Sequence, residues 1–185
     1  ALGQDVDTQE WRVACGFAGY ESVAESVEAL LLRGLAKSGE AGPEIGWSFA
    51  HGMVRAALEQ RAEAAGRLEG HHRACAEMLL RAAGGDENPK DPLLAERLGR
   101  HLAQGGDPDR ALRPLMRAAR TRAQAGDYGY AEVILHEWDS ALRGLRLEPE
   151  DNRPCAGELL RAELARVRGR IDEALTLSTQ ALELA

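Results

Sequence analysis

Two histidines and a cysteine that stand close together are the side chains of this sequence best suited to binding a transition metal. His71 and His72 precede Cys75 by four and three residues, spacings that bring side chains together on one face of a helix. A zinc site needs three or four ligands, and the sequence contains no second group with ligand spacing. We therefore expect these residues to pack between helices with one histidine exposed, a metal site being the alternative, and we expect no cofactor.

Neither covalent catalysis nor nucleotide hydrolysis has a recognisable arrangement in the chain. No serine lies in a G-x-S-x-G turn, and no G-x-x-x-x-G-K-[ST] loop is available to hold phosphates. The acidic residues are plentiful but scattered. We therefore predict that the chain is not an enzyme and has no catalytic residues.

A cluster of arginines is the most pronounced charge feature of the sequence. The segment from residue 97 to residue 122 contains seven arginines and two acidic residues. Four of these arginines, at spacings i, i+3, i+7 and i+10, fall on one helical stripe: Arg110, Arg113, Arg117 and Arg120. The stripe predicts a docking site for an acidic peptide or an acidic neighbouring domain, because guanidinium groups bind carboxylates in pairs. The alternative is a solvated face with pairing inside the helix.

The net charge of −7 disfavours nucleic acid and anionic membranes as partners. No apolar run reaches the ~20 residues of a membrane span, and the N-terminus does not look like a signal peptide. Three widely spaced cysteines do not form a disulfide framework. These features predict a cytoplasmic protein with reduced thiols and a protein partner.

The elements that would position these residues are mainly helices, since Ala, Leu, Arg and Glu dominate and aromatic residues make up only 4%. In a first domain, residues 1–83, the pattern predicts helices over residues 8–15, 22–33 and 68–83, and another starting near Met53. Between them, two short strands, Leu35–Ala36 and Trp47–Phe49, would form a small β-hairpin. Residues 84–92 have the composition of a linker.

The second domain, residues 93–185, contains a recurring phrase. Gly106, Gly126 and Gly169 each end a helical segment, and an alanine follows five residues later at Ala111, Ala131 and Ala174. Glycine supplies the left-handed position that ends a helix, and a small residue lets the next helix approach closely. Five helices are predicted, over residues 92–103, 108–125, 128–145, 155–168 and 171–184, with a second linker over residues 146–154.

This phrase resembles that of tetratricopeptide repeats, although the period is irregular. The resemblance implies a right-handed superhelical stack of α-α hairpins. Its apolar stripes are expected to be buried, including Ile134, Leu135, Trp138 and Leu175. The last stripe is still well formed at Ala185, so we expect the array to continue in a longer parent protein.

A second resemblance rests on the stretch from Trp47 to Leu58, which contains Phe49, His51, Val54 and Arg55, and on residues 72–77. It is similar to the segment that follows the nucleotide-binding core in bacterial STAND-type signal-transduction ATPases, which include ATPase-coupled transcription activators and ATPase-fused serine/threonine kinases. The resemblance implies a winged-helix-like block before the repeats. It also implies that nucleotide is hydrolysed in an upstream domain, which His51 and Arg55 would contact. Ala56, Glu59 and His71 depart from the family phrase.

The function implied is a non-catalytic regulatory and protein-interaction segment that relays partner binding to the absent core. Two alternatives remain. The chain could be a stand-alone tetratricopeptide-like adaptor whose first block is an irregular helical cap, or a DNA-binding winged-helix regulator. The helix expected to read DNA argues against the latter, because Glu21, Glu25 and Glu28 outnumber Arg33 and repel phosphates.

Overall fold

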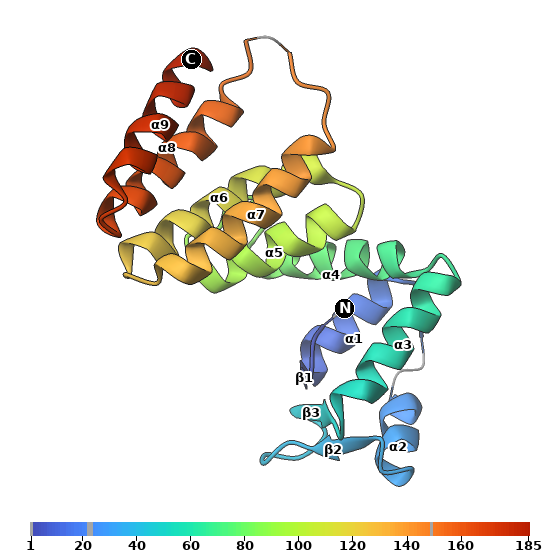
Figure 1. Cartoon of the computed structure of the whole chain (residues 1–185). Coiled ribbons are helices and arrows are strands. Elements are labelled where there is room, and N and C mark those ends of the chain that lie inside the picture. Colours follow the sequence, from blue (N-terminus) through green and yellow to red (C-terminus); the bar gives the residue numbers. More distant parts are fainter. Residues whose placement is uncertain (1, 22–23, 149) are drawn as a thin grey trace. The chain divides into compact units, whose positions relative to one another are not determined.

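The structure, a computed structural model, describes residues 2–21, 24–148 and 150–185. It is mainly helical with one small sheet, and it divides into two compact units. The first unit contains Ala1–Gly85 with Gln104–Gly106, and the second contains Asp86–Ala103 with Asp107–Ala185. Figure 1 labels the elements of both units.

The first unit alternates short strands with helices. Its elements in chain order are β1 (Asp5–Asp7), α1 (Thr8–Phe17), α2 (Ala24–Leu32), β2 (Ala36–Ser38), β3 (Gly46–Phe49), α3 (Gly52–Ala64) and α4 (Leu68–Ala82). Asp7 begins α1 as its N-cap, since its carboxylate accepts a hydrogen bond from the Glu10 backbone N–H. Gly34, at φ +66°, follows the end of α2, as the sequence predicts.

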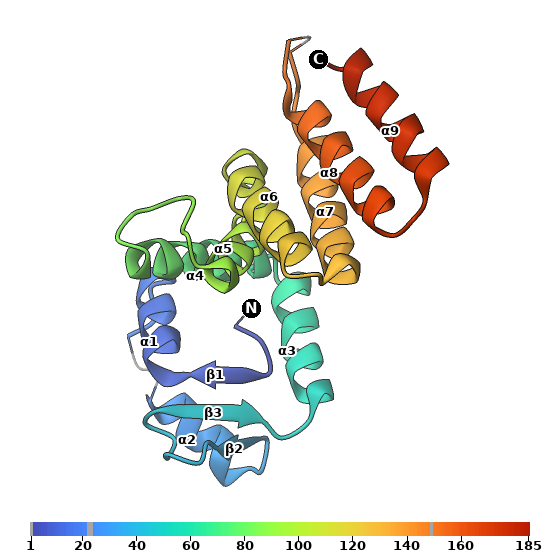
Figure 2. The same cartoon turned by 90° about the vertical axis from the view of Figure 1, so that its left-hand side faces the viewer.

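The three strands form an antiparallel sheet in the order β1-β3-β2 (Figure 2). Val6 pairs with Trp47 and Lys37 pairs with Ser48. The hairpin of β2 and β3 confirms the two strands expected from the sequence, with shifted ends. Strand β1 was not predicted, because one valine between two aspartates is too short to show a strand pattern, and only pairing with β3 forms the strand. The core beneath the sheet contains Val6, Val27, Ala36 and Trp47.

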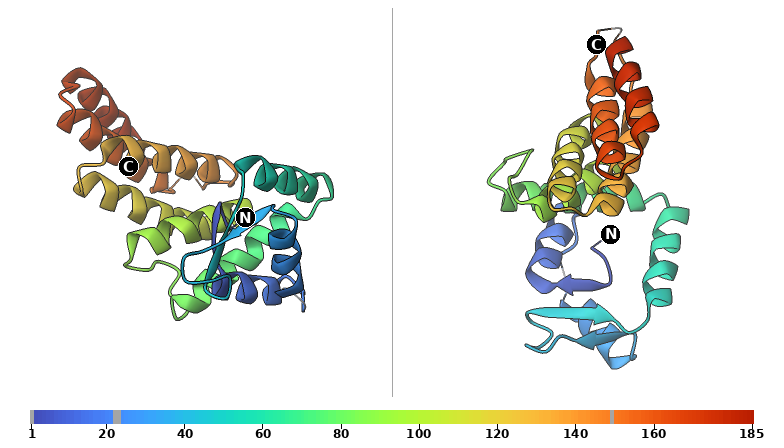
Figure 3. Two further views of the ribbon diagram at one scale, coloured as in Figure 1. Left: turned by 90° about the horizontal axis from the view of Figure 1, so that it is seen from below. Right: turned by 60° about the vertical axis from the view of Figure 1, so that its left-hand side comes forward.

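The second unit is helical, and four of its helices pack as two antiparallel pairs. Its elements are α5 (Pro92–Gln104), α6 (Pro108–Gln124), α7 (Tyr128–Arg143), α8 (Arg153–Val167) and α9 (Ile171–Glu183). Helices α6 and α7 lie side by side, as do α8 and α9 (Figures 1 and 3). All five predicted helices are therefore present, with ends shifted by one to two residues.

The recurring glycine phrase has the predicted geometry. Gly106, Gly126 and Gly169 adopt φ values of +83°, +82° and +75°, which L-residues with a side chain rarely adopt. The alanines five residues later are buried in the following helices. The phrase therefore ends one helix and lets the next approach its neighbour closely, as expected.

Close packing also determines where glycine lies inside the helices. A Cβ at Gly157 of α8 would lie 2.6 Å from Cζ3 of Trp138 on α7. A Cβ at Gly99 of α5 would lie 2.6 Å from Cγ of Leu115 on α6. Trp138 is only 2% exposed, and Ile134 and Leu135 are buried as predicted.

One predicted core position is wrong. Leu175 is 63% exposed, and Ile171 and Leu182 of the same stripe are also exposed, so that α9 buries mainly Ala174 and Ala181. Among the described residues α9 packs against α8 alone, and its two alanines form that contact. Periodicity identified the apolar face, but not whether a second helix covers it. The predicted helix over residues 22–33 includes Ser22 and Val23, which lie outside the described residues.

None of the helices in the described part of the chain combines the length and apolar character that crossing a bilayer requires.

Candidate functional site

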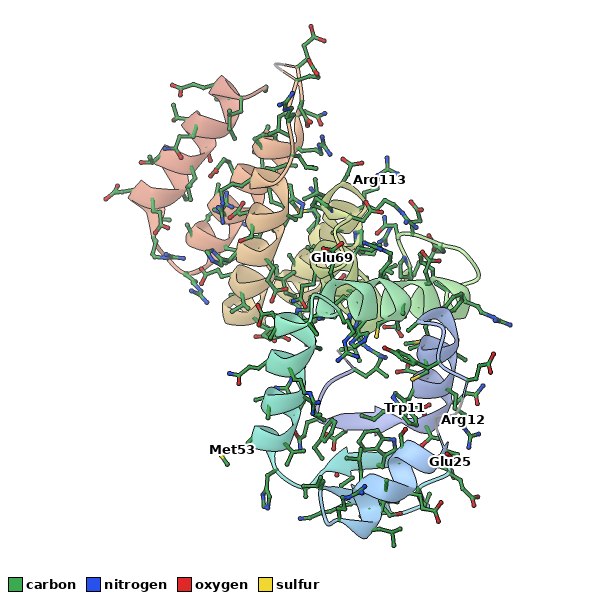
Figure 4. The ribbon with its side chains drawn as sticks, turned by 90° about the vertical axis from the view of Figure 1, so that its right-hand side faces the viewer. Trp11, Arg12, Glu25, Met53, Glu69 and Arg113 are labelled. Carbon is green, nitrogen blue, oxygen red and sulfur yellow. The ribbon has the colours of Figure 1, made fainter. Side chains whose placement is uncertain are left out.

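Helix α6 positions the arginine stripe by its amphipathic pattern. Asp107 caps it, accepting from the Arg110 backbone N–H at 3.4 Å, and Pro108 occupies the first turn. The apolar positions of α6 are buried. Arg113 and Arg120 are exposed and Arg117 is half-buried; Figure 4 shows Arg113 extending away from the α6 ribbon.

The four arginines of the stripe line one groove of about 930 Å³ in the second unit. Leu112, Met116 and Trp138 contribute its apolar lining, and they are at least 91% buried. Glu87 and Asn88, in the segment before α5, lie along the groove, and so do residues at the start of α8. We call this feature the arginine groove.

Two arginines of the groove are neutralised by carboxylates. Arg110 donates to Glu87 at 2.9 Å and to Asp107 at 3.1 Å. Burial would lower the pKa of Arg110, but these bonds outweigh it and raise the pKa. Arg153, from α8, donates to Asp151 and Asp109, each at 2.5 Å, and the hydrogen bond from Arg153 lowers the pKa of Asp151. Arg110 is thus paired both with Asp107, three residues before it, and with Glu87, which reaches it from a distant segment.

Three arginines of the groove have no carboxylate partner in the described residues. Arg117 donates its Nε–H to the neutral Asn88 side chain at 2.7 Å. The guanidinium groups of Arg113 and Arg120 have neither an ion pair nor a hydrogen bond among the described parts of the chain. The groove therefore holds three unneutralised cations along two turns of one helix.

The two residues expected to contact an ATPase core both lie on or beside α3. His51 occupies the N-cap position of α3, but it is exposed and its side chain makes no capping hydrogen bond. Arg55 donates to Glu59 at 3.0 Å, and both side chains are half-buried. The i, i+4 pair with Glu59 holds Arg55 beside an apolar pocket.

The histidine–cysteine group lies on α4, as the spacing predicts. His72 and Cys75 are buried, and His71 is half-buried with its Nε2 3.5 Å from the Tyr20 hydroxyl. Burial lowers the pKa of His71, and it lowers the pKa of His72 to about 4. Within residues 2–21, 24–148 and 150–185, no group of three His, Cys, Asp or Glu side chains is placed to hold a metal.

The first unit contains a pocket of about 460 Å³ that was not predicted from the sequence. Helices α1, α3 and α4 and the strands β1 and β3 contribute its lining, which is dominated by apolar side chains. Trp11 of α1 lies beside the sheet in this region (Figure 4). In the sequence the pocket is represented by small residues on three separate helices. Periodicity within each helix does not show that these three helix faces meet around one cavity. We call this feature the first-unit pocket.

No family model, curated protein or solved structure matches this chain.

Proposed function

We propose that this chain is a non-catalytic regulatory and protein-interaction segment of a larger bacterial signalling ATPase or kinase, and that its arginine groove binds an acidic segment of a protein partner. The observation that carries the proposal is the set of three arginines without a carboxylate partner, Arg113, Arg117 and Arg120, in a concave surface. In this role the chain presents a binding surface and leaves nucleotide hydrolysis to another domain.

The geometry of α6 favours an acidic peptide in an extended conformation. Arg113 and Arg120 are seven residues apart, which corresponds to about 10 Å along a helix axis. An extended peptide in the polyproline II conformation advances about 3.1 Å per residue with three residues per turn. Acidic side chains three residues apart then lie on one face of the peptide, about 9 Å apart, and match this distance. Arg117 lies between the two and can bind the same segment.

The charges around the groove favour a peptide over a nucleic acid. Glu87, Asp109 and Asp151 also line the groove, and they would repel a continuous row of phosphates. A peptide with isolated carboxylates can avoid these acids. In the first unit, α2 includes Glu25 and Glu28, which disfavours DNA there as well.

The sheet of the first unit supports the winged-helix-like part of the proposal over an irregular helical cap. The hairpin of β2 and β3 lies where the family resemblance places a wing, and α2 precedes it directly. The glycine turns and helix pairs of the second unit support the tetratricopeptide-like part. The proposal requires a nucleotide-binding domain in the same reading frame, and a parent gene without one would contradict this part of it.

Fluorescence anisotropy with labelled peptides tests the groove. One peptide carries glutamates three residues apart, and a second has the same composition with adjacent glutamates. At about 100 mM salt, where short-range ion pairs persist, we expect the spaced peptide to bind more tightly. The double substitution Arg113→Gln with Arg120→Gln should lower the affinity for the spaced peptide at least ~10-fold, since each charged hydrogen bond contributes about 1.5–3 kcal/mol.

Arg166→Gln is the matched control, because Arg166 is an exposed residue of α8 outside the groove. Its affinity for the spaced peptide should stay within about twofold of the unmodified chain. If the double variant and the Arg166→Gln control bind the spaced peptide equally well, the arginine groove is not the binding site. Tighter binding of duplex DNA than of either peptide would favour the nucleic-acid alternative.

A further inference from the structure

Small residues on three helices leave the first-unit pocket open. Ala14 of α1, Ala62 of α3 and Ala74 of α4 all line it, and each is at least 93% buried. No large side chain from these positions fills the space between the helices. The resulting volume of about 460 Å³ lies in the range of pockets that enclose small molecules.

Aromatic side chains line the pocket where it meets the sheet. Trp11 and Trp47 contact each other edge to face with ring centroids 5.6 Å apart, and Trp47 and Phe49 do so at 5.0 Å. Trp47 is 4% exposed and therefore fixed in place. Such a rigid apolar wall suits the apolar body of a ligand, because it needs no rearrangement to receive it.

The polar lining of the pocket is predominantly cationic. Arg55, Arg61 and Arg67 line it, whereas Glu59 is the one carboxylate among the described lining residues. Glu59 forms an ion pair with Arg55. Arg61 and Arg67 are exposed, and their guanidinium groups have no ion pair or hydrogen bond in the described parts of the chain. The pocket therefore favours an anionic group near the turn between α3 and α4.

Two hydrogen-bond donors among the lining residues are unsatisfied. The indole Nε1 of Trp47 and the guanidinium Nε of Arg55 are buried and lack a partner among the described residues. A buried donor without an acceptor is rare in folded proteins. An oxygen acceptor supplied by a ligand would satisfy either one.

We propose that the first-unit pocket binds a small amphipathic carboxylic acid. Its apolar body contacts Trp11, Trp47 and the three alanines, and its carboxylate interacts with Arg61 and Arg67. This site does not depend on the arginine groove, which lies in the other unit. Arg55, which lines the pocket, is also a residue expected to contact the ATPase core, so under the proposed function the pocket would act as a small-molecule input to the regulatory segment.

Isothermal titration calorimetry with decanoate, decanol and decylamine tests this assignment, each kept below its aggregation threshold. The three probes share an apolar chain and differ in charge. We expect decanoate to bind with one-to-one stoichiometry and at least ~10-fold more tightly than decanol, as a charge-assisted contact implies. Decylamine should bind more weakly than decanol. Tryptophan fluorescence of a Trp138→Phe variant gives a second readout, since Trp11 and Trp47 then supply the emission.

Charge variants locate the carboxylate without touching the core. The double substitution Arg61→Gln with Arg67→Gln should weaken decanoate about 10-fold and leave decanol unchanged. Arg81→Gln is the matched control, because Arg81 is an exposed residue of α4 outside the pocket. It should leave both affinities within about twofold.

A filled pocket tests the position of the apolar body. Ala74→Leu should abolish decanoate binding, provided that circular dichroism shows the variant to be folded. If Ala74→Leu does not fold, Ala14→Val is used in its place, with the same expected loss of binding. Decanoate affinity that equals that of decanol would overturn the proposal. So would equal losses in the arginine variant and in the Arg81 control, or the absence of saturable decanoate binding below about 1 mM.

Discussion

At Gly157 the packing of α7 against α8 leaves room for a hydrogen atom and no more. Replacement by alanine would place a methyl group against the ring of the buried Trp138, with a separation of 2.6 Å before relaxation. We expect Gly157→Ala to lower the free energy of unfolding by about 1–3 kcal/mol, the usual cost of overpacking. Urea denaturation measures the change.

The matched control for Gly157 is Gly70 in α4. A Cβ at Gly70 meets no atom within 4 Å, and alanine is a better helix former than glycine by up to ~1 kcal/mol. Gly70→Ala should therefore be neutral or stabilising. A similar loss of stability in both variants would show that helix packing at Trp138 is not the cause.

His72 makes stability depend on pH. Burial lowers its pKa to about 4, with Glu59 opposing the shift, whereas an unfolded histidine titrates near 6.5. Between pH 6.5 and pH 4 the unfolded chain binds more protons at His72 than the folded chain does. The free energy of unfolding therefore falls as the pH falls through this window. We expect a loss of about 1 kcal/mol between pH 7 and pH 5, with allowance for solvent screening.

Denaturation at the two pH values, with and without His72→Gln, checks this expectation. The substitution removes the titrating group, so the variant should lose less stability on acidification than the unmodified chain. Replacing the exposed His136 of α7 should leave the pH dependence as it was. An unchanged slope in the His72 variant would assign the effect to other groups.

At the scale of elements, a buried glutamate joins three helices of the second unit. Glu96 of α5 accepts from Arg100 at 2.6 Å, from Arg122 of α6 at 3.2 Å and from the Tyr130 hydroxyl of α7 at 2.8 Å. Its side chain is 6% exposed, and the Arg122 guanidinium lies 4.7 Å from the Tyr130 ring centroid. The network fixes how α5, α6 and α7 pack together.

Glu96→Ala should destabilise the chain by about 2–4 kcal/mol, because it leaves two arginines without their shared partner. Glu163→Ala on α8 is the control, since Glu163 is exposed and its replacement should cost less than about 0.5 kcal/mol. Chemical denaturation of the two variants gives the comparison. A loss of under 1 kcal/mol at Glu96 would mean that water replaces the network.

Element by element, the sequence predicted most of what depends on local chemistry. The left-handed turns at Gly106, Gly126 and Gly169 and the ends of five helices follow from glycine and periodicity. The parts that were missed depend on distant contacts. Strand β1 requires β3, the pairing of Arg110 requires Glu87, and the exposure of Leu175 depends on which helices surround α9.

The two candidate sites differ in the same way, since one depends on local spacing and the other on distant contacts. A helical stripe places Arg113, Arg117 and Arg120 together because all three lie on α6, and spacing alone reveals that. The first-unit pocket combines three helices with two strands, so its lining is not contiguous in the sequence. Only the fold brings Trp11 and Trp47 to within 5.6 Å of each other.

At the scale of the whole molecule, charge is distributed unevenly. The chain carries a net charge of −7, yet five arginines and only three acidic residues line the arginine groove. The net charge of the chain repels an acidic partner, whereas the arginine groove attracts it. Such an arrangement favours specific binding over general affinity for anions.

Two compact units predict two unfolding events. We expect scanning calorimetry to resolve two transitions, and Glu96→Ala to lower the midpoint of only one of them, because all partners of Glu96 lie in the second unit. A single transition shifted as a whole by this substitution would show that the chain unfolds as one cooperative unit.

The exposed leucines of α9 affect how the chain behaves during purification. Leu175 and Leu182 are 63% and 78% exposed on a helix that buries little except alanine. In concentrated ammonium sulfate such a surface adheres to phenyl resin, because the salt strengthens apolar contacts. The chain should therefore elute from the resin at lower salt or higher detergent than its acidic composition suggests. Replacing Leu175 and Leu182 by serine should make it elute at higher salt.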